Sequence, residues 1–458
     1  MTSSRFWAGP TLLLVWIVLG ITAILPTPTC GFTSYVSQFL RVNYTADGIW
    51  DNSTLVAQQS IIDAANWYAE QAPWSVLNKT FLAPSNNTHD YLSWAAYYWP
   101  DCSNVGNTTA LTPQQEWTEC VYVDRDGQFS PDVRLVNNSG DFQAMSDAIF
   151  YNAMAYKLGG NETFAQRVAS YVDVWFINNA TAMNPNLNYA QLIRGVDSSG
   201  KGQHTGVLDL HDMTKVVSAI LLLRVMASPS WTQQLDSAMN DWCTQYVEWL
   251  MTSPIALEEK AAANNHGSFY ASQTSSIQLL IGNTTDAQAT LNNYFQGIYQ
   301  NQIVANGDQP LESVRTRPFH YRAYNAAAII TINRIAEYMG IDTWNITTAA
   351  GTTVHDAVNY AMAQAPGNDN PLELSPVLAA AAMHYGDPKD AYASWIAKQD
   401  DVYPGEEYFF WEQPLSNSGL KVFINWNLEL RAGDPPPGSG TNINGSNGSR
   451  YPDAAWRV

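Results

Sequence analysis

The sequence predicts an all-α fold in which pairs of helices close into an incomplete ring, an (α/α)n toroid. Three observations support this class. Apolar residues recur at three- and four-residue steps beyond about residue 50, convincing strand patterns are few, and no nucleotide-binding glycine loop follows a strand. Roughly five or six successive helical hairpins favour a ring over a bundle, because each hairpin must bury both faces against neighbours.

The clearest helical pair lies in the middle of the chain. The upstream helix covers about 212–227 and is ended by Pro229. The downstream helix is expected to begin at Ser230, with Gln233 completing a capping box. Further helices are expected at about 54–71, 141–159, 162–176, 268–282, 285–300, 321–339, 352–364, 376–386 and 388–399.

The two ends of the chain are expected to lie outside the helical domain. Arg5 precedes an apolar run from Phe6 to Leu25, and small residues follow, which is typical of a secretory signal peptide over 1–29. The run is slightly long for such a signal, so an uncleaved signal anchor is the alternative. Residues 433–458 are rich in Gly, Pro, Ser and Asn and are expected to form a flexible tail. We expect the residues between these two segments, 30–432, to form a single catalytic domain.

Several features are typical of a secreted protein. Acceptor sequences for N-glycosylation occur at Asn43, Asn52, Asn78, Asn86, Asn107, Asn137, Asn161, Asn179, Asn283, Asn345, Asn444 and Asn447. Cys102 and Cys120 flank a polar, turn-rich segment and are the natural disulfide pair in an oxidising compartment. Cys243 lies inside a helical pattern and is expected to be a buried free thiol.

The charge balance limits the partners. Charged residues make up 14% of the chain, and the net charge is −19. Nucleic acids and anionic membranes both require a basic surface, so neither is expected as a partner, and we expect a monomer. No spacing of His and Cys indicates a metal site, and no cofactor is expected. An anionic substrate would need a local cluster of positive charge.

One segment provides such a cluster. Residues 312–325 contain Arg315, Arg317, Arg322 and His320 together with two tyrosines. On composition alone, a solvated helix start explains this segment equally well. Cations at a helix start oppose the helix dipole, however, which favours an anion-binding role.

Together with other segments, these residues resemble a known family. The string Asn-Asn-His at 264–266 is followed about fifty residues later by Arg-x-Arg-x-x-His-Tyr at 315–321. The segments 122–128 (Tyr-Val-Asp-Arg-Asp-Gly-Gln) and 184–191 (Asn-Pro-Asn-Leu-Asn-Tyr-Ala-Gln) fit the same pattern. Over about 90–340 the chain is similar to the alginate-lyase superfamily of toroidal polysaccharide lyases, especially its fungal, glucuronan-lyase-like branch.

The resemblance implies an enzyme that cleaves 1,4-linked uronic-acid polymers, alginate, polymannuronate or glucuronan, by β-elimination. Removing the C5 proton requires that the adjacent carboxylate be neutralised. By resemblance, Asn265 and His266 bind that carboxylate, Arg315 supplies positive charge, and Tyr321 transfers the protons. A neighbouring arginine is expected to favour the tyrosinate form.

The resemblance leaves a second tyrosine as a candidate. Tyr324 follows Arg317 by seven residues, which is similar to the spacing in bacterial alginate lyases, whereas Tyr321 follows Arg315 by six. We prefer Tyr321. The expected substrate contacts are Arg125, Asn188, Arg317, His320 and Tyr324. For Arg125 and Asn188, a loop salt bridge and an Asx turn are alternative structural roles.

Two other functions fit a helical toroid. A glycoside hydrolase would need two carboxylates about the scissile bond, and candidates are the acidic pairs 400–401 and 406–407 and the group Asp101, Asp124 and Asp126. A non-catalytic cell-wall glycan-binding protein would keep the fold and lack the chemistry. The sequence leaves open the uronic acid preferred, endo or exo action, and whether the signal is cleaved.

Overall fold

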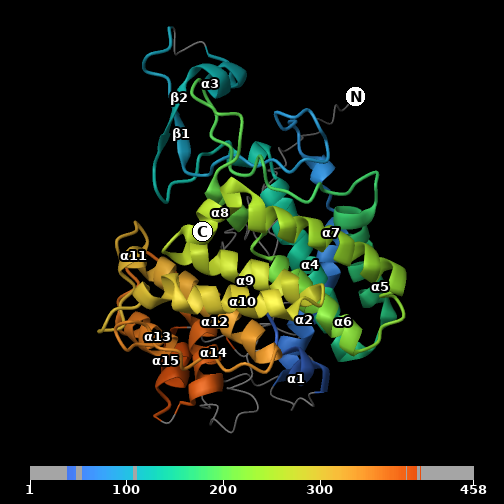
Figure 1. Cartoon of the computed structure of the whole chain (residues 1–458), viewed down its shortest axis with the longest axis vertical. Helices are drawn as coiled ribbons and strands as arrows, with labels where there is room; N and C mark the ends of the chain where they lie inside the picture. The colour runs from blue at the N-terminus through green and yellow to red at the C-terminus, as the bar shows by residue number, and fades with distance from the viewer. Residues whose placement is uncertain (1–38, 48–53, 107–110, 388, 400–402, 404–458) are drawn as a thin grey trace, which may run out of the picture.

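The computed structural model describes residues 39–47, 54–106, 111–387, 389–399 and 403, and its fold is helical (Figure 1). The helices are α1 (Val42–Asp47), α2 (Leu55–Gln71), α3 (Pro113–Glu119), α4 (Asn138–Gly159), α5 (Glu162–Val172), α6 (Met213–Val225), α7 (Gln233–Thr252), α8 (Pro254–Ala261), α9 (Asn265–Leu280), α10 (Thr284–Gln296), α11 (Pro310–Ser313), α12 (Pro318–Tyr338), α13 (Val354–Ala363), α14 (Ser375–Tyr385) and α15 (Ala391–Gln399). The two strands are β1 (Tyr98–Asp101) and β2 (Val121–Asp124). The all-α prediction is confirmed.

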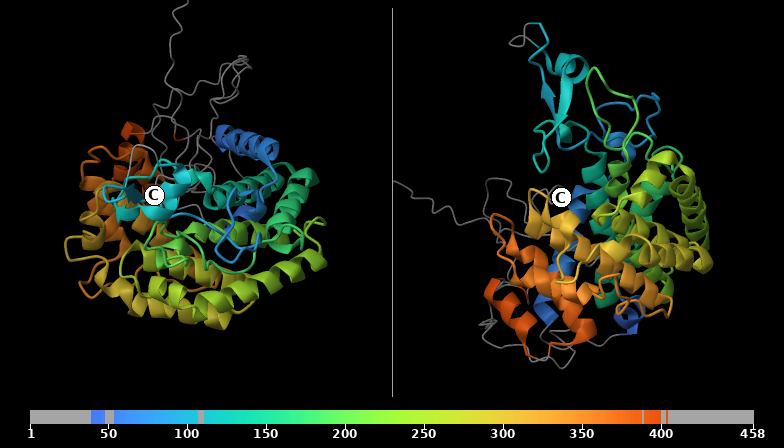
Figure 2. Two further views of the ribbon diagram at one scale, coloured as in Figure 1. Left: turned by 90° about the horizontal axis from the view of Figure 1, so that it is seen from above. Right: turned by 60° about the vertical axis from the view of Figure 1, so that its left-hand side comes forward.

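The helices alternate between buried and half-exposed members. Helices α4, α6, α9, α12 and α14 are buried along most of their length. Amphipathic helices cover them: α2 and α5 pack on α4, α7 and α10 on α9, α13 on α12, and α15 on α14. Seen from above, the helices follow one another around a ring from blue through green to orange (Figure 2). The fold is an α/α toroid.

Helix α9 is buried although its sequence is polar. Ser275 and Ser276 are fully buried and donate hydrogen bonds to the carbonyl oxygens of Ala271 (2.7 Å) and Gln273 (2.9 Å). These bonds satisfy the hydroxyls without a partner helix. The helix can therefore lie inside the ring despite its lack of a long apolar run.

Several helix boundaries differ from the predicted ones. Thr232, not Ser230, caps α7, and its side chain accepts from the backbone N–H of Leu235 at 3.2 Å. The backbone N–H of Ser230 instead donates to Glu162 at 3.1 Å, which ties it to α5. Helices α9 and α12 begin three residues earlier than expected, at Asn265 and Pro318. Both shifts place predicted site residues inside a first helical turn.

A small lobe rises above the ring (Figures 1 and 2) and was not predicted. Strands β1 and β2 pair antiparallel, with Tyr98 opposite Asp124, and α3 connects them. Four-residue strands are too short to give a clear alternating pattern. Cys102 and Cys120 are bonded across this lobe with Cα atoms 4.7 Å apart, and Cys243 is a buried free thiol, so both cysteine predictions are confirmed.

Some predictions fall on residues outside those described. These are the signal segment 1–29, the tail 433–458, and the acidic pairs 400–401 and 406–407. Among the described residues, no helix is both long enough and apolar enough to span a membrane.

We expect loss of the Cys102–Cys120 bond to destabilise the lobe. The bond closes a loop with a sequence separation of 18, and the chain-entropy estimate for such a loop is about 3 kcal/mol. Cys102→Ser, Cys120→Ser and the double variant should therefore lose similar free energies of unfolding in urea titrations. A double variant that loses about twice as much as either single variant would contradict a shared bond.

Candidate functional site

A cleft of about 530 Å³ lies between the lobe and the ring. The lobe contributes Tyr97, Asp124 and Asp126, and the segment before α6 contributes Gln191, His204, Thr205 and Asp209. The first turn of α9 contributes Asn265 and His266, and the α11–α12 region contributes Arg315, Tyr321 and Tyr324. Residues that are far apart in the sequence therefore meet in one cavity of the size that ligand sites have.

Arg315 is the centre of a polar cluster at one end of the cleft. Its Nη2 donates to Asp126 Oδ1 at 2.7 Å and to the Tyr321 hydroxyl at 2.8 Å. The guanidinium also lies over the Tyr321 ring, 3.8 Å from its centroid. The hydroxyls of Tyr97 and Tyr321 are 3.2 Å apart. Asp126 thus links the lobe to the ring through Arg315.

The electrostatics of Tyr321 differ from the sequence expectation. Burial raises the pKa of Tyr321, the neighbouring Tyr97 raises it further, and Arg315 only partly opposes them. The arginine therefore does not shift the tyrosine toward tyrosinate overall. Tyr321 therefore carries its proton at neutral pH.

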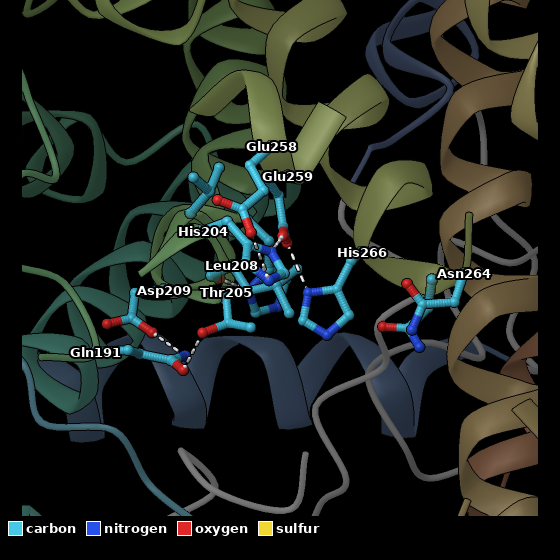
Figure 3. Close-up of polar contacts among 12 residues, drawn as sticks. Gln191, His204, Thr205, Leu208, Asp209, Glu258, Glu259, Asn264 and His266 are labelled. Carbon is cyan, nitrogen blue, oxygen red and sulfur yellow. Dashed lines mark hydrogen bonds and ion pairs between the residues drawn. The ribbon is translucent and has the colours of Figure 1, made fainter. Parts of the chain in front are cut away.

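A buried carboxylate connects two histidines in the middle of the cleft (Figure 3). Glu259 of α8 is fully buried; its Oε1 lies 2.7 Å from Nδ1 of His266, and its Oε2 lies 2.6 Å from Nδ1 of His204. With Nδ1–H donating to Glu259, the other ring nitrogen of His266, Nε2, is an acceptor that points away from the glutamate (Figure 3).

The same three residues form a group that could hold a metal ion, with ligand atoms within 4.8 Å of one another. Ligands at zinc distances of about 2.1 Å in a tetrahedron lie about 3.4 Å apart. The Glu259–histidine separations of 2.6 and 2.7 Å are shorter than that. They are hydrogen-bond distances, so the arrangement fits a shared carboxylate better than a metal centre.

Asn265 is oriented by a second buried carboxylate. Its backbone N–H and its Nδ2 donate to the two oxygens of Glu312, each at 2.7 Å. Burial raises the pKa of Glu312, and the hydrogen bonds from Asn265 oppose this rise. The Oδ1 atom of Asn265 is buried and has no hydrogen-bond partner among the described residues. A buried acceptor of this kind is ready for a donor from a ligand.

Tyr324, the second tyrosine candidate, lines the cleft but lies deep within its wall. Its ring packs against Phe269, with centroids 4.2 Å apart, and stacks on His320 at 5.6 Å. It does not share the contact between Arg315 and Tyr321.

Four predicted substrate contacts do not line the cleft. Arg317 forms ion pairs with Asp369 (3.0 Å) and Glu373 (3.3 Å). His320 is fully buried, and its Nδ1 lies 2.6 Å from Glu373. These two residues fix the start of α12 to the segment before α14.

The other two residues lie on the surface. The guanidinium of Arg125 stacks on Trp99 at 4.8 Å, and the exposed Asn188 accepts a hydrogen bond from the indole of Trp249 at 2.9 Å. The quoted segment 184–191 reaches the cleft through its last residue, Gln191, instead.

Sequence reasoning missed several cleft residues. Gln191 and Asp126 stood inside quoted segments, and Glu312 opened the arginine-rich one, so inspection of every polar residue in those segments would have found them. His204, Asp209 and Glu259 lie in no such segment. Their roles depend on partners that only the fold brings near.

Comparison with known proteins places the chain in a family. The family model described as alginate lyase matches residues 75–371, more than half of the chain. No curated protein matches the chain. The crystal structure of an alginate lyase from Bacteroides ovatus has 27% identity and a TM-score of 0.71, covering 82% of this chain and 97% of that one.

Two more distant structures are also similar. Alginate lyase A1-III from Sphingomonas species A1 has 14% identity and a TM-score of 0.46, covering 78% of this chain and 89% of that one. A variant of alginate lyase A1-III complexed with a tetrasaccharide has 13% identity and a TM-score of 0.47, covering 80% and 92%. From the family match over residues 75–371, together with the toroid shared with the Bacteroides ovatus structure, the chain belongs to the alginate lyase family and is a polysaccharide lyase.

Proposed function

We propose that the protein cleaves 1,4-linked uronic-acid polymers, alginate, polymannuronate or glucuronan, by β-elimination, and that it belongs to the glucuronan-lyase-like branch of its family. The observation that carries this proposal is the meeting of Asn265, His266, Arg315 and Tyr321 in one cleft. The direct test is to incubate the protein with polymannuronate, polyguluronate and glucuronan and to follow the ultraviolet absorbance of the unsaturated product.

In this mechanism the substrate carboxylate lies between Asn265 and Arg315. Arg315 supplies positive charge, and the buried Oδ1 of Asn265 accepts a hydrogen bond from the carboxyl group when that group carries a proton. The Arg315 contact becomes stronger as negative charge from C5 spreads onto the carboxyl group, whereas Asn265 Oδ1 fixes the position of the carboxyl proton. Glu312 supports them by holding the Asn265 amide in one orientation.

Two groups then move protons. His266 Nε2 removes the C5 proton, since Glu259 holds Nδ1 and leaves Nε2 as the acceptor. Tyr321 gives its proton to the departing O4 oxygen, as its raised pKa favours the protonated form. The sequence-based proposal gave both transfers to Tyr321; the protonated state of this tyrosine is our reason for moving the base role to His266.

The arrangement of carboxylates argues against the hydrolase alternative. Asp126 is bound to Arg315 at 2.7 Å, and Asp101 does not line the cleft. Glu259 and Glu312 are buried behind the residues that they orient. Asp124 also lines the cleft, but its neighbour Asp126 is held by Arg315, so these two do not form the free pair about a scissile bond that a hydrolase needs.

We also propose that the protein is secreted, glycosylated and monomeric, as the sequence predicts. In support, the acceptor asparagines Asn78, Asn86, Asn161, Asn179 and Asn283 are all exposed. A glycosidase-induced mass shift of the protein recovered from culture medium tests this proposal.

Replacing Tyr321 should abolish most activity. Tyr321→Phe keeps the ring beneath Arg315 and removes the proton donor, so kcat should fall by about 10²-fold or more with KM little changed. Tyr324→Phe is the matched control, and its activity should remain near that of the wild type. The reverse result would assign proton transfer to Tyr324.

Replacing Asn265 should impair both binding and turnover. Asn265→Ala removes the oriented amide that holds the carboxyl group beside Arg315, and we expect a decrease of about 10²-fold in kcat/KM, because misplacing the reacting group raises the barrier as well as weakening binding. Asn292→Ala, at an exposed site on α10, serves as the control. Thermal unfolding of both variants shows whether the loss of activity arises from a less stable fold, since Asn265→Ala also removes a hydrogen bond to Glu312. Unchanged kcat/KM in folded Asn265→Ala would remove Asn265 from the mechanism.

Glu259 and the histidines should produce a pH window of stability. Burial alone would raise the pKa of Glu259, but His266 and His204 hold it below the ordinary value. The hydrogen bond to Glu259 raises the pKa of His204 despite partial burial. A carboxyl group whose pKa is lowered in the folded state stabilises the fold at pH values above its unfolded pKa, and this stabilisation is lost as the pH falls through the folded pKa. An imidazole whose pKa is raised in the folded state stabilises the fold at pH values below its unfolded pKa, and this stabilisation is lost as the pH rises through the folded pKa.

The Glu259–His204 ion pair is therefore complete between about pH 4.3 and about pH 6.5. We expect Glu259→Gln to lose most unfolding free energy, relative to wild type, within this window and less on either side. Urea titrations at a series of pH values measure the difference. Glu258→Gln, the neighbouring exposed glutamate 3.7 Å from His204, should have little effect. A pH-independent loss would contradict the ion pair.

A further inference from the structure

The cleft continues past the residues that the proposed reaction uses. Gln191, Thr205 and Asp209 lie on one side of His266, whereas Asn264 lies on the other (Figure 3). Gln191 Nε2 donates to Asp209 Oδ1 at 2.9 Å, and Thr205 Oγ1 donates to Gln191 Oε1 at 2.9 Å. The amide of Gln191 is thus oriented from both ends.

The backbone of Gln191 is also held in an unusual conformation. Its φ is +49°, which is uncommon for a residue other than glycine. Its N–H donates to Ser93 Oγ at 2.7 Å, and its carbonyl accepts from Gln203 Nε2 at 2.8 Å. Strained residues that their surroundings fix in this way cluster at ligand sites.

The remaining hydrogen-bonding capacity of Gln191 matches a hydroxyl group. An amide offers two N–H donors and two lone pairs. Asp209 takes one donor and Thr205 takes one lone pair, so one donor and one acceptor remain. A sugar hydroxyl donates and accepts and can use both. A carboxylate only accepts and can use one of them.

The charges around Gln191 do not favour a carboxylate. Asp209 is half-buried beside it and also accepts from Tyr91 at 3.0 Å, and in either protonation state it supplies no positive charge. Among the described residues that line the cleft, Arg315 alone is permanently cationic. Three histidines also line the cleft and could become positive; of these, His204 has Glu259 and Glu258 beside its two ring nitrogens.

We infer that Gln191, Thr205 and Asp209 form a subsite for an uncharged sugar residue next to the uronate that is cleaved, recognised through its hydroxyl groups. This inference rests on the proposed lyase function and extends its substrates to polysaccharides that also contain neutral sugars. The preferred substrate is a polysaccharide in which uronates are joined to neutral sugars, and homopolymers of uronic acid are poorer substrates.

The test compares kcat/KM on glucuronan and polymannuronate with kcat/KM on a polymer of alternating glucuronate and neutral hexose. Wild type should prefer the alternating polymer by about tenfold or more, the scale of one well-placed hydrogen bond. Gln191→Ala should lose most of this preference by slowing the alternating polymer alone. Gln288→Ala, an exposed glutamine on α10, should behave as wild type.

Two further variants guard against misfolding of Gln191→Ala. Thr205→Val keeps the side-chain size, removes the donor to Gln191, and should reduce the preference in the same direction. Gln191→Lys places a cation beside Asp209 and should shift the preference toward the homopolymers. A purely structural role for Gln191 would lower the rates on all polymers equally and leave the ratio unchanged.

The possible failures are distinguishable. Equal wild-type kcat/KM on homopolymers and the alternating polymer, or an unchanged ratio in all three variants, overturns the subsite while leaving the lyase activity intact. If wild type cleaves no uronate polymer, the proposed function fails. In that case calorimetry with a neutral oligosaccharide decides: binding to wild type but not to Gln191→Ala supports the subsite, and no binding to wild type overturns it.

Discussion

The site depends on carboxylates buried at the rim of the ring. A carboxylate is costly to remove from water unless charged or hydrogen-bonding partners surround it. Glu259, Glu312 and Glu373 are each about 1% exposed or less, and each holds a polar side chain that the sequence motif contains. Glu259 holds His266, Glu312 holds Asn265, and Glu373 holds His320. Each glutamate and its motif residue therefore form a hydrogen-bonded pair, and removing one partner leaves the other without that hydrogen bond.

This dependence explains why the motif serves two purposes. Asn265, His266, Arg315 and Tyr321 reach the cleft, whereas Arg317 and His320 turn away from it toward Glu373. Successive residues at a helix start point in different directions. In a short string of polar residues, some side chains therefore face the cleft and others bind to the rest of the protein. Arg317 and His320 fix the start of α12, and α12 in turn positions Tyr321.

The sequence was sufficient for the fold class and for four polar residues that meet in the cleft, but not for their surroundings. Helical periodicity identified most of the ring, and resemblance identified the residues from Asn265 to Tyr321. The lobe was missed because its two strands have four residues each, too few for an alternating pattern. Gln191 was missed in favour of Asn188 because both lie on one irregular segment, where no periodicity tells which side chain faces inward. Arg315 lowers the pKa of Tyr321 as expected, but burial, which a sequence does not display, outweighs this one neighbouring charge.

The charge distribution also bears on how an acidic chain could bind the anionic polymer that we propose as its substrate. The chain has a net charge of −19, and Asp126 already pairs with the permanent cation of the cleft at 2.7 Å. Long-range attraction of a polyanion is therefore weak, and recognition must rely on short, oriented contacts. A guanidinium that is partly neutralised in the resting site binds a ground-state carboxylate only moderately. In the proposed mechanism its attraction grows as charge accumulates on the carboxyl group during proton removal, and such differential binding would accelerate the reaction instead of trapping the substrate.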